Sequence, residues 1–282
     1  MTTATSASAV PNQFVEVDGR RLAYRVIGEG TPLVLCLRFR GVMDDWDPAF
    51  LDALAVHGFR VYIFDYSGLG WSTGQPTYDP ISLAKDAIDL IQVLGLGRVV
   101  LGGWSIGGVA AQLVMLQAPH VLSHLLLIAT TPPGLLVRTG EPLFYELAAR
   151  ENDFEDFVSL FFEPISASSR EAAVSSAARI AQRSEGRCQP VAYDWAMQFL
   201  GDGPRDSVFP LQAAMDALKQ TKTPVMHLGG DHDIVFPVEN WYALNRTLPS
   251  LHLLTLPSSG HAPQNQYPHA CAAHVAAFVL AQ

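Results

Sequence analysis

Basic residues are scarce in this sequence. It has 18 Lys and Arg against 27 Asp and Glu, a formal net charge of −9 at pH 7, and no basic run. Proteins that bind nucleic acid or anionic membranes gather Lys and Arg into patches. The charge balance therefore argues against a nucleic-acid or membrane partner and favours a neutral or apolar small molecule.

Cysteine and long apolar runs are also scarce. The three cysteines, Cys36, Cys188 and Cys271, form no CxxC pair, which argues against a disulfide framework and favours a reducing compartment. No apolar run approaches the ~18 residues of a membrane span. Residues 1–12 show neither the basic start nor the apolar centre of a signal peptide, and we expect a disordered tail there. These absences predict a cytoplasmic protein.

The sequence is rich instead in short apolar runs that alternate with helical patterns. Asp18-Gly19 joins two alternating segments and predicts an opening hairpin, because this pair supplies the positive φ of a tight turn. Further strands are predicted at 32–37, 60–65, 98–103, 122–129, 224–230 and 251–256. Helices are predicted at 48–57, 81–94, 106–117, 238–248 and 269–280. Repeated strand-then-helix units predict an α/β fold with a doubly wound, mostly parallel sheet.

One long interval breaks this alternation. Residues 133–220 contain helical patterns but no convincing strand, and they are too many for a simple connector. We expect a helical cap at 133–220, inserted into a core formed by 13–132 and 221–282. Its aromatic residues either pack the cap onto the sheet or line a substrate pocket, and they are Phe144, Tyr145, Phe157, Phe161, Phe162, Trp195 and Phe199.

The stretch GGWSIGG, residues 102–108, places Ser105 between a predicted strand and a predicted helix. A nucleophile on such a turn needs an unusual backbone conformation, and glycines two residues away on either side let the neighbouring backbone approach. The helix start also offers the N–H of Ile106 to a developing oxyanion. The context favours a catalytic serine over a structural one.

A nucleophilic serine needs a base and a group that orients the base. His261 lies in a Ser/Gly-rich loop between the last predicted strand and the last predicted helix, where side chains project over the carboxyl edge of the sheet. Asp231 and Asp233 compete for the orienting role in GGDHDIVFP. Asp233 is favoured because its place four residues before Pro237 puts it at the loop tip.

Other chemistries find less support. His227, Asp231, His232 and Asp233 are close in sequence, but His227 belongs to a predicted buried strand and the paired-histidine spacings of zinc hydrolases are absent. No GxGxxG or GxxxxGK[ST] loop is present. We expect no metal and no cofactor.

The elements GWSIG, FDYSGLGWS, GGDHDIVFP and SGH resemble those of the α/β-hydrolase superfamily, in its chain order of nucleophile, acid and histidine. The resemblance covers nearly the whole chain and implies Ser105 as nucleophile, His261 as general base and Asp233 as its orienter. It implies that Asp65 braces a turn. The superfamily usually has His-Gly before an oxyanion-hole residue, whereas this chain reads LRFRG and places Phe39 at the position of the second oxyanion amide.

The predicted reaction is acyl transfer from an ester or lactone to water. Carbon–carbon bond hydrolysis and perhydrolysis use similar triads, and a hydrolase-like fold can also serve as a ligand receptor, so these alternatives stay open. Whether the chain forms a homo-oligomer also stays open. Candidate substrate contacts are Arg38, Arg40, Trp104 and Trp195. The two arginines either bind a substrate carbonyl or carboxylate, or pair with Asp44, Asp45 or Asp47 nearby.

Overall fold

The computed structural model describes residues 6–209 and 211–280. Strands β1 (Gln13–Val17) and β2 (Arg20–Ile27) form an antiparallel hairpin. Asp18 and Gly19 at its turn have φ values of 48° and 74°, so the predicted hairpin is confirmed. β2 continues the sheet by pairing antiparallel with β4 (Phe59–Phe64).

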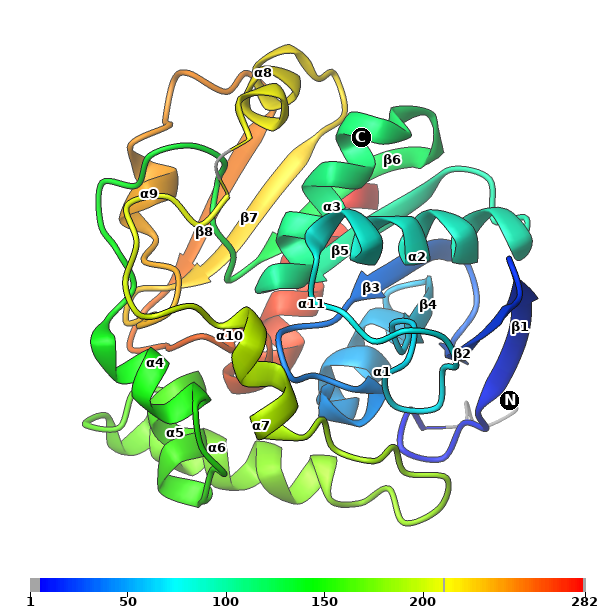
Figure 1. The fold of residues 1–282 in the computed structure, drawn as a ribbon, viewed down its shortest axis with the longest axis horizontal. Helices are drawn as coiled ribbons and strands as arrows, with labels where there is room; N and C mark the ends of the chain where they lie inside the picture. Colours follow the sequence, from blue (N-terminus) through cyan, green and yellow to red (C-terminus); the bar gives the residue numbers. More distant parts are fainter. Residues whose placement is uncertain (1–5, 210, 281–282) are drawn as a thin grey trace.

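The remaining strands run parallel in a single sheet of order β1-β2-β4-β3-β5-β6-β7-β8 (Figure 1). Their bounds are β3 (Thr31–Cys36), β5 (Val99–Trp104), β6 (Leu122–Ile128), β7 (Val225–Gly230) and β8 (Leu251–Leu256). The strand order reverses direction at β3, which lies between β4 and β5. Ligands of doubly wound sheets bind at such a switch point, outside the carboxyl ends of the strands. The predicted fold class is confirmed.

Helices cover both faces of this sheet (Figure 1). One layer contains α2 (Pro80–Val93), α3 (Ile106–Gln117) and α8 (Gln212–Gln220), and the other contains α1 (Pro48–Val56) and α11 (Pro268–Leu280). The Asp47 and Asp79 carboxylates cap α1 and α2, each followed by a proline at the first helical position, which is a favourable helix start.

The helix predicted at 238–248 is much shorter in the structure. Only α9 (Glu239–Tyr242) is α-helical, and turns follow it. Arg246 has φ 69°, in the left-handed region that a right-handed helix excludes. The sequence predicted a helix through 248 and gave no sign of this break in the backbone path.

The long interval between β6 and β7 contains α4 (Pro142–Ala148), α5 (Phe154–Phe161), α6 (Ala167–Ile180), α7 (Tyr193–Ala196) and then α8. No strand occurs among the described residues of 133–220, from which only position 210 is left out. Helices α4 to α7 lie beyond the carboxyl ends of the strands, whereas α8 packs on α3 in the core (Figure 1). We therefore propose that the cap ends before α8, one helix earlier than the sequence suggested.

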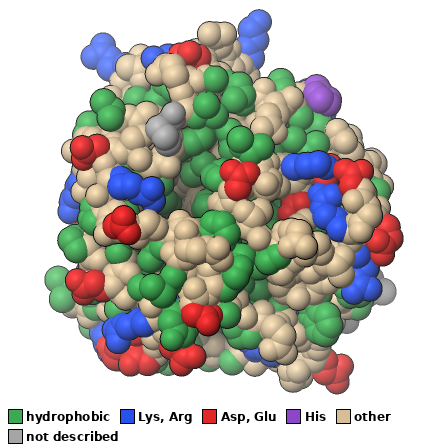
Figure 2. Space-filling model, in the orientation of Figure 1, with side chains coloured by type: hydrophobic (Ala, Val, Ile, Leu, Met, Phe, Trp, Pro, Cys, Tyr) green, Lys and Arg blue, Asp and Glu red, His purple; other side chains and the backbone are tan. Residues whose placement is uncertain are grey.

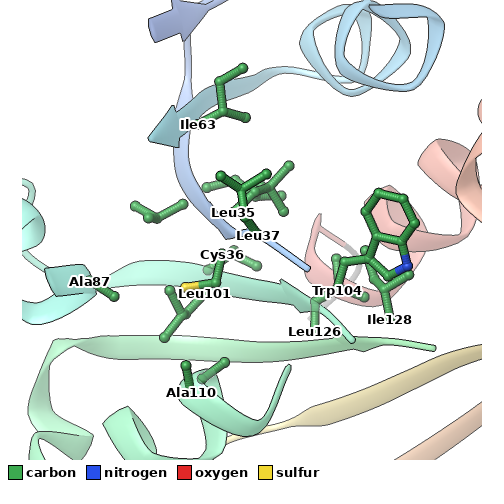
Figure 3. Packing of buried hydrophobic residues seen from close by; sticks show 14 of the residues in the cluster. Leu35, Cys36, Leu37, Ile63, Ala87, Leu101, Trp104, Ala110, Leu126 and Ile128 are labelled. Carbon is green, nitrogen blue, oxygen red and sulfur yellow. The ribbon is translucent and has the colours of Figure 1, made fainter. Parts of the chain in front are cut away.

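The core lies between the sheet and its helical layers. Leu35, Leu101 and Leu126 on adjacent strands are fully buried there (Figure 3). On the visible surface, acidic and basic side chains are interspersed and form no continuous basic patch (Figure 2). None of the helices in the described ranges is both long and apolar enough to cross a membrane.

The predicted disordered tail is wrong for residues 6–12. Ala7 and Val10 are buried. The Ala7 amide donates to Asp52 Oδ1 at 2.7 Å, and Arg183 Nη1 donates to the Val10 carbonyl at 3.0 Å. Small apolar side chains and satisfied backbone groups hold this segment, and polar composition alone could not reveal them. Residues 1–5 lie outside the described residues.

Candidate active site

Ser105 occupies the turn between β5 and α3 with φ 61° and ψ −125°. This backbone conformation is uncommon for a residue with a side chain. A Cβ on Gly103 would lie 2.1 Å from the Gly107 carbonyl oxygen, and a Cβ on Gly107 would lie 2.5 Å from that of Cys36. The two glycines thus let the turn close tightly against β3 while Ser105 stays at its tip.

The contact at Gly107 makes a prediction. We expect Gly107→Ala to lower the free energy of unfolding by about 3 kcal/mol, the upper end of the usual cost of overpacking, because the added methyl group meets backbone atoms that cannot rotate away. Gly95→Ala is the matched control, since a Cβ there meets nothing within 4 Å and only the φ of 60° is strained. Urea unfolding of both variants measures the difference, and equal losses would mean that the contact does not matter.

His261 and Asp233 form a buried pair beside this turn. His261 Nδ1 lies 2.8 Å from Asp233 Oδ2 and 3.0 Å from Oδ1. The amides of Val235 and Phe236 donate to Asp233 Oδ1 at 2.8 and 3.0 Å and fix the carboxylate. The competing Asp231 is exposed and bonds His232 Nδ1 at 2.6 Å instead. The structure thus places Asp233, and not Asp231, against His261.

Ser105 and His261 line one cavity of about 280 Å³. Phe39 lines the same cavity, and half-buried Ile106 begins α3 beside Ser105. Ile106 is not among the residues that line the cavity, but its amide, like the other first N–H groups of a helix, has no acceptor within α3. Asp233 is not in the cavity lining and contacts two residues that are, His261 and Val235.

The loop that contains Phe39 is held by two arginine side chains. Arg38 Nη1 donates to the Phe39 carbonyl at 2.8 Å, and its Nη2 lies 3.1 Å from Asp45 Oδ1. Arg40 has φ 54°, and its Nη1 donates to the Ala148 and Arg150 carbonyls of the cap at 3.0 and 2.9 Å. These contacts hold the loop backbone on both sides of Phe39.

Comparison with known proteins gives this arrangement its family. The model of the alpha/beta hydrolase fold family matches residues 31–266. The chain belongs to this family.

Its relatives have several activities. This hydrolase is 26% identical over 249 residues to BpoC of Mycobacterium tuberculosis, assigned as a non-heme bromoperoxidase, an alignment of 85% of this chain and 90% of that protein. It is 28% identical over 187 residues to a pimeloyl-[acyl-carrier protein] methyl ester esterase of Aromatoleum aromaticum, covering 61% of this chain and 70% of the relative. An alpha/beta hydrolase fold protein from Chitinophaga pinensis superposes with a TM-score of 0.81 at 25% identity, covering 97% and 98% of the two chains.

Two of the four candidate substrate contacts, Trp104 and Trp195, lie outside the cavity lining. Trp104 is buried, packs against Phe161, and donates from Nε1 to the His261 carbonyl at 2.7 Å. Trp195 packs on Tyr78, with ring centroids 5.6 Å apart. Neither tryptophan lines the cavity. Trp104 therefore supports the histidine loop, and Trp195 fastens the cap to the core.

Of the cap aromatics, Phe144, Phe157 and Phe161 line the cavity. The structure adds cavity residues that no motif indicated, among them Asn152, Asp153 and Arg187. Both cap loops that bring these residues to the cavity are irregular. No periodic pattern could have placed them.

Asp65 braces the loops beside the site. Its carboxylate accepts the amides of Met43 and Trp71 at 2.8 and 2.9 Å and lies 3.2 Å from Cys188 Sγ. Burial raises the pKa of Asp65 to about 6 against these hydrogen bonds. These contacts match the bracing role that the resemblance implied.

The His227 cluster is dispersed in the structure. His227 stacks on Trp241, and burial lowers the pKa of its imidazole to about 3. Asp231 bonds His232, and Asp233 bonds His261. Within 6–209 and 211–280, no three His, Cys, Asp or Glu side chains gather as metal ligands would.

Proposed function

We propose that this protein is a serine hydrolase that cleaves a carboxylic ester or lactone through an acyl-enzyme. One observation carries the proposal. Ser105, on a turn with φ 61°, shares a cavity with His261, whose Nδ1 is hydrogen bonded to buried Asp233. This is the arrangement of nucleophile, base and orienter that acyl transfer needs.

The chemistry follows from the donors and acceptors. Ionised Asp233 can only accept, so Nδ1 of His261 carries its proton there and Nε2 is free to act as base. Nε2 takes the Ser105 proton as Oγ attacks the carbonyl carbon, and the N–H groups of Ile106 and Phe39 stabilise the oxyanion. His261 then protonates the leaving alkoxide. Water, deprotonated by the same nitrogen, attacks the acyl-enzyme and releases the acid and free Ser105.

The cavity supports a small, partly apolar substrate. Its volume of about 280 Å³ is at the small end for ligand pockets. Phe144, Phe157, Phe161 and Val191 provide apolar walls. A relative that acts as a methyl ester esterase adds support for an ester bond.

The test is a panel of p-nitrophenyl esters of increasing acyl length together with aliphatic and aromatic lactones, each assayed with the wild type and Ser105→Ala. We expect saturable hydrolysis of short to medium esters or lactones that Ser105→Ala abolishes. Hydrolysis that Ser105→Ala leaves intact would refute the proposal. Ligand binding with no turnover and no covalent modification of Ser105 would favour the receptor alternative.

The bonds from Arg40 to the cap suggest that the cap helps to hold the oxyanion amide of Phe39. We expect Arg40→Met to lower kcat/KM at least about tenfold for every ester, a fraction of the loss caused by removing an oxyanion donor outright. Arg170→Met is the control, because it removes an arginine of the cap that pairs with exposed Glu155 outside the cavity. Steady-state kinetics of both variants on neutral esters measure the difference. Equal effects of the two variants would contradict this role.

Perhydrolysis is a second candidate, favoured by the similarity to BpoC. Hydrogen peroxide in place of water would attack the same acyl-enzyme and release a peroxycarboxylic acid. Adding peroxide to the ester assay tests it. Peracid formation that depends on Ser105 would support it, and unchanged acid release would rule it out.

A further inference from the structure

Some charged side chains of the catalytic cavity have an ion-pair partner and others have none. Three arginines, Arg38, Arg40 and Arg187, and three aspartates, Asp44, Asp45 and Asp153, line it. Equal numbers suggest a neutral cavity. The hydrogen bonds show otherwise.

Each of the three carboxylates is already engaged. Asp44 Oδ1 lies 2.6 Å from Arg25 Nη1 and 3.4 Å from Arg183 Nε, and both arginines are buried. Asp45 pairs with Arg38 at 3.1 Å. Asp153 caps α5 by accepting the Asp156 amide at 2.9 Å. The charges of Asp44 and Asp45 are thus balanced by arginines, and among the described lining residues Asp153 is the one carboxylate without an ion-pair partner.

Arg40 and Arg187 have no carboxylate partner among the described residues. Arg40 Nη1 bonds the Ala148 and Arg150 carbonyls, and Arg187 Nη1 bonds the Ile180 and Arg183 carbonyls at 3.4 and 3.1 Å. Backbone carbonyls fix the direction of a guanidinium but leave its charge unbalanced. In the described part of the chain, Nε and Nη2 of both arginines donate to no protein atom.

The surroundings of Arg40 reinforce this imbalance. It is half-buried, and burial and the Arg38 charge lower the pKa of its guanidinium more than nearby Tyr78, Asp45 and Glu151 raise it, so a further anion beside it would be stabilised. Arg187 is exposed where it lines the cavity. A protein of net charge −9 thus has two unpaired cations in its catalytic cavity.

We propose that the substrate carries a carboxylate at the end remote from its scissile carbonyl, and that Arg40 and Arg187 bind this carboxylate. The inference rests on the proposed serine hydrolase function and narrows its substrate to a half-ester of a dicarboxylic acid, or a lactone bearing a carboxylate. A guanidinium presents paired donors that match the two oxygens of a carboxylate. Anchoring that end holds the ester carbonyl beside Ser105, which lowers the entropic cost of attack.

The experiment compares two esters of the same shape. Monomethyl esters of the dicarboxylic acids from butanedioic to octanedioic acid are assayed beside the analogues in which a primary amide replaces the free carboxylate. We expect the carboxylate to be preferred in kcat/KM by at least about tenfold at the best chain length, about 1.4 kcal/mol. High salt should reduce this preference, because screening weakens charge recognition.

Variants then show which residues cause the preference for the carboxylate ester over its amide analogue. Arg187→Met and Arg40→Met should each bring the ratio of carboxylate to amide close to one, whatever they do to the absolute rates. Arg187→Lys should keep part of the ratio because it keeps the charge. Arg170→Met removes the same charge outside the cavity and should leave the ratio as it is in the wild type.

The outcomes separate the inference from the function it rests on. Two results would overturn the carboxylate site and leave the hydrolase function intact. One is a wild-type ratio of kcat/KM near one, with the methyl ester of the amide analogue hydrolysed. The other is a loss of this ratio in Arg170→Met equal to that in Arg40→Met or Arg187→Met. No turnover and no fluorophosphonate labelling of Ser105 overturns both. If Ser105 is labelled but methyl esters are not turned over, the dicarboxylates and their monoamides are compared as protectants against labelling, and equal protection overturns the site.

Discussion

Ser105→Ala and His261→Ala should each lower kcat by about 10⁴- to 10⁶-fold, and the double variant should be little worse than either single variant. The reason is that the base has no function without its nucleophile, and the nucleophile is not activated without its base. Single-turnover and steady-state rates on the best ester of the panel measure the effect. Both variants should keep the wild-type melting temperature within a few degrees, which excludes unfolding as the cause.

Additive losses in that double-mutant cycle would contradict the triad. They would mean that Ser105 and His261 contribute independently. The cavity would then need a different nucleophile. Among the described residues its lining offers no second serine or threonine, and burial raises the pKa of its one thiol, Cys188.

Asp233→Asn should lower kcat by about 10⁴-fold, because an amide can donate to Nδ1 and so favours the tautomer with its proton on Nε2, which cannot act as base. Asp231→Asn should change kcat less than about tenfold, since Asp231 bonds exposed His232 and the Ser259 amide instead. The comparison is a matched one, because the same chemical change is made two residues apart in one loop. The reverse ranking would show that the catalytic carboxylate was assigned to the wrong residue.

The sequence predicted the sheet and the three candidate catalytic side chains for a common reason. Each depends on local chain chemistry. Buried parallel strands are short apolar runs, and Ser105 is enclosed by glycines that the turn needs. His261 and Asp233 each follow a strand of that sheet, and the carboxyl ends of parallel strands meet at one edge.

The misassigned residues depend on contacts between distant segments. Trp104 does not line the cavity and donates from Nε1 to the His261 carbonyl, and Trp195 packs on Tyr78. Residues 6–12 were expected to be disordered, yet Arg183 of the cap holds their backbone. The local sequence does not predict contacts between residues so far apart in the chain.

The net charge of the chain does not by itself give the charge of the cavity. The acidic composition favoured a neutral or apolar ligand, and most of the acidic excess lies away from the site. Arg25 and Arg183, which do not line the cavity, pair with its Asp44, and Arg40 and Arg187 have no ion-pair partner in the described part of the chain. The charge that a substrate meets is set by which side chains are already paired.

The central claim is that Ser105 forms a covalent acyl-enzyme, and trapping by a fluorophosphonate tests it most directly. Intact-mass spectrometry after exposure to the probe should show one added phosphonyl group, and peptide mapping should place it on Ser105. His261→Ala should slow the labelling by orders of magnitude while Arg170→Met leaves its rate unchanged. A folded wild type that stays unlabelled, or a label on any residue other than Ser105, would contradict the account.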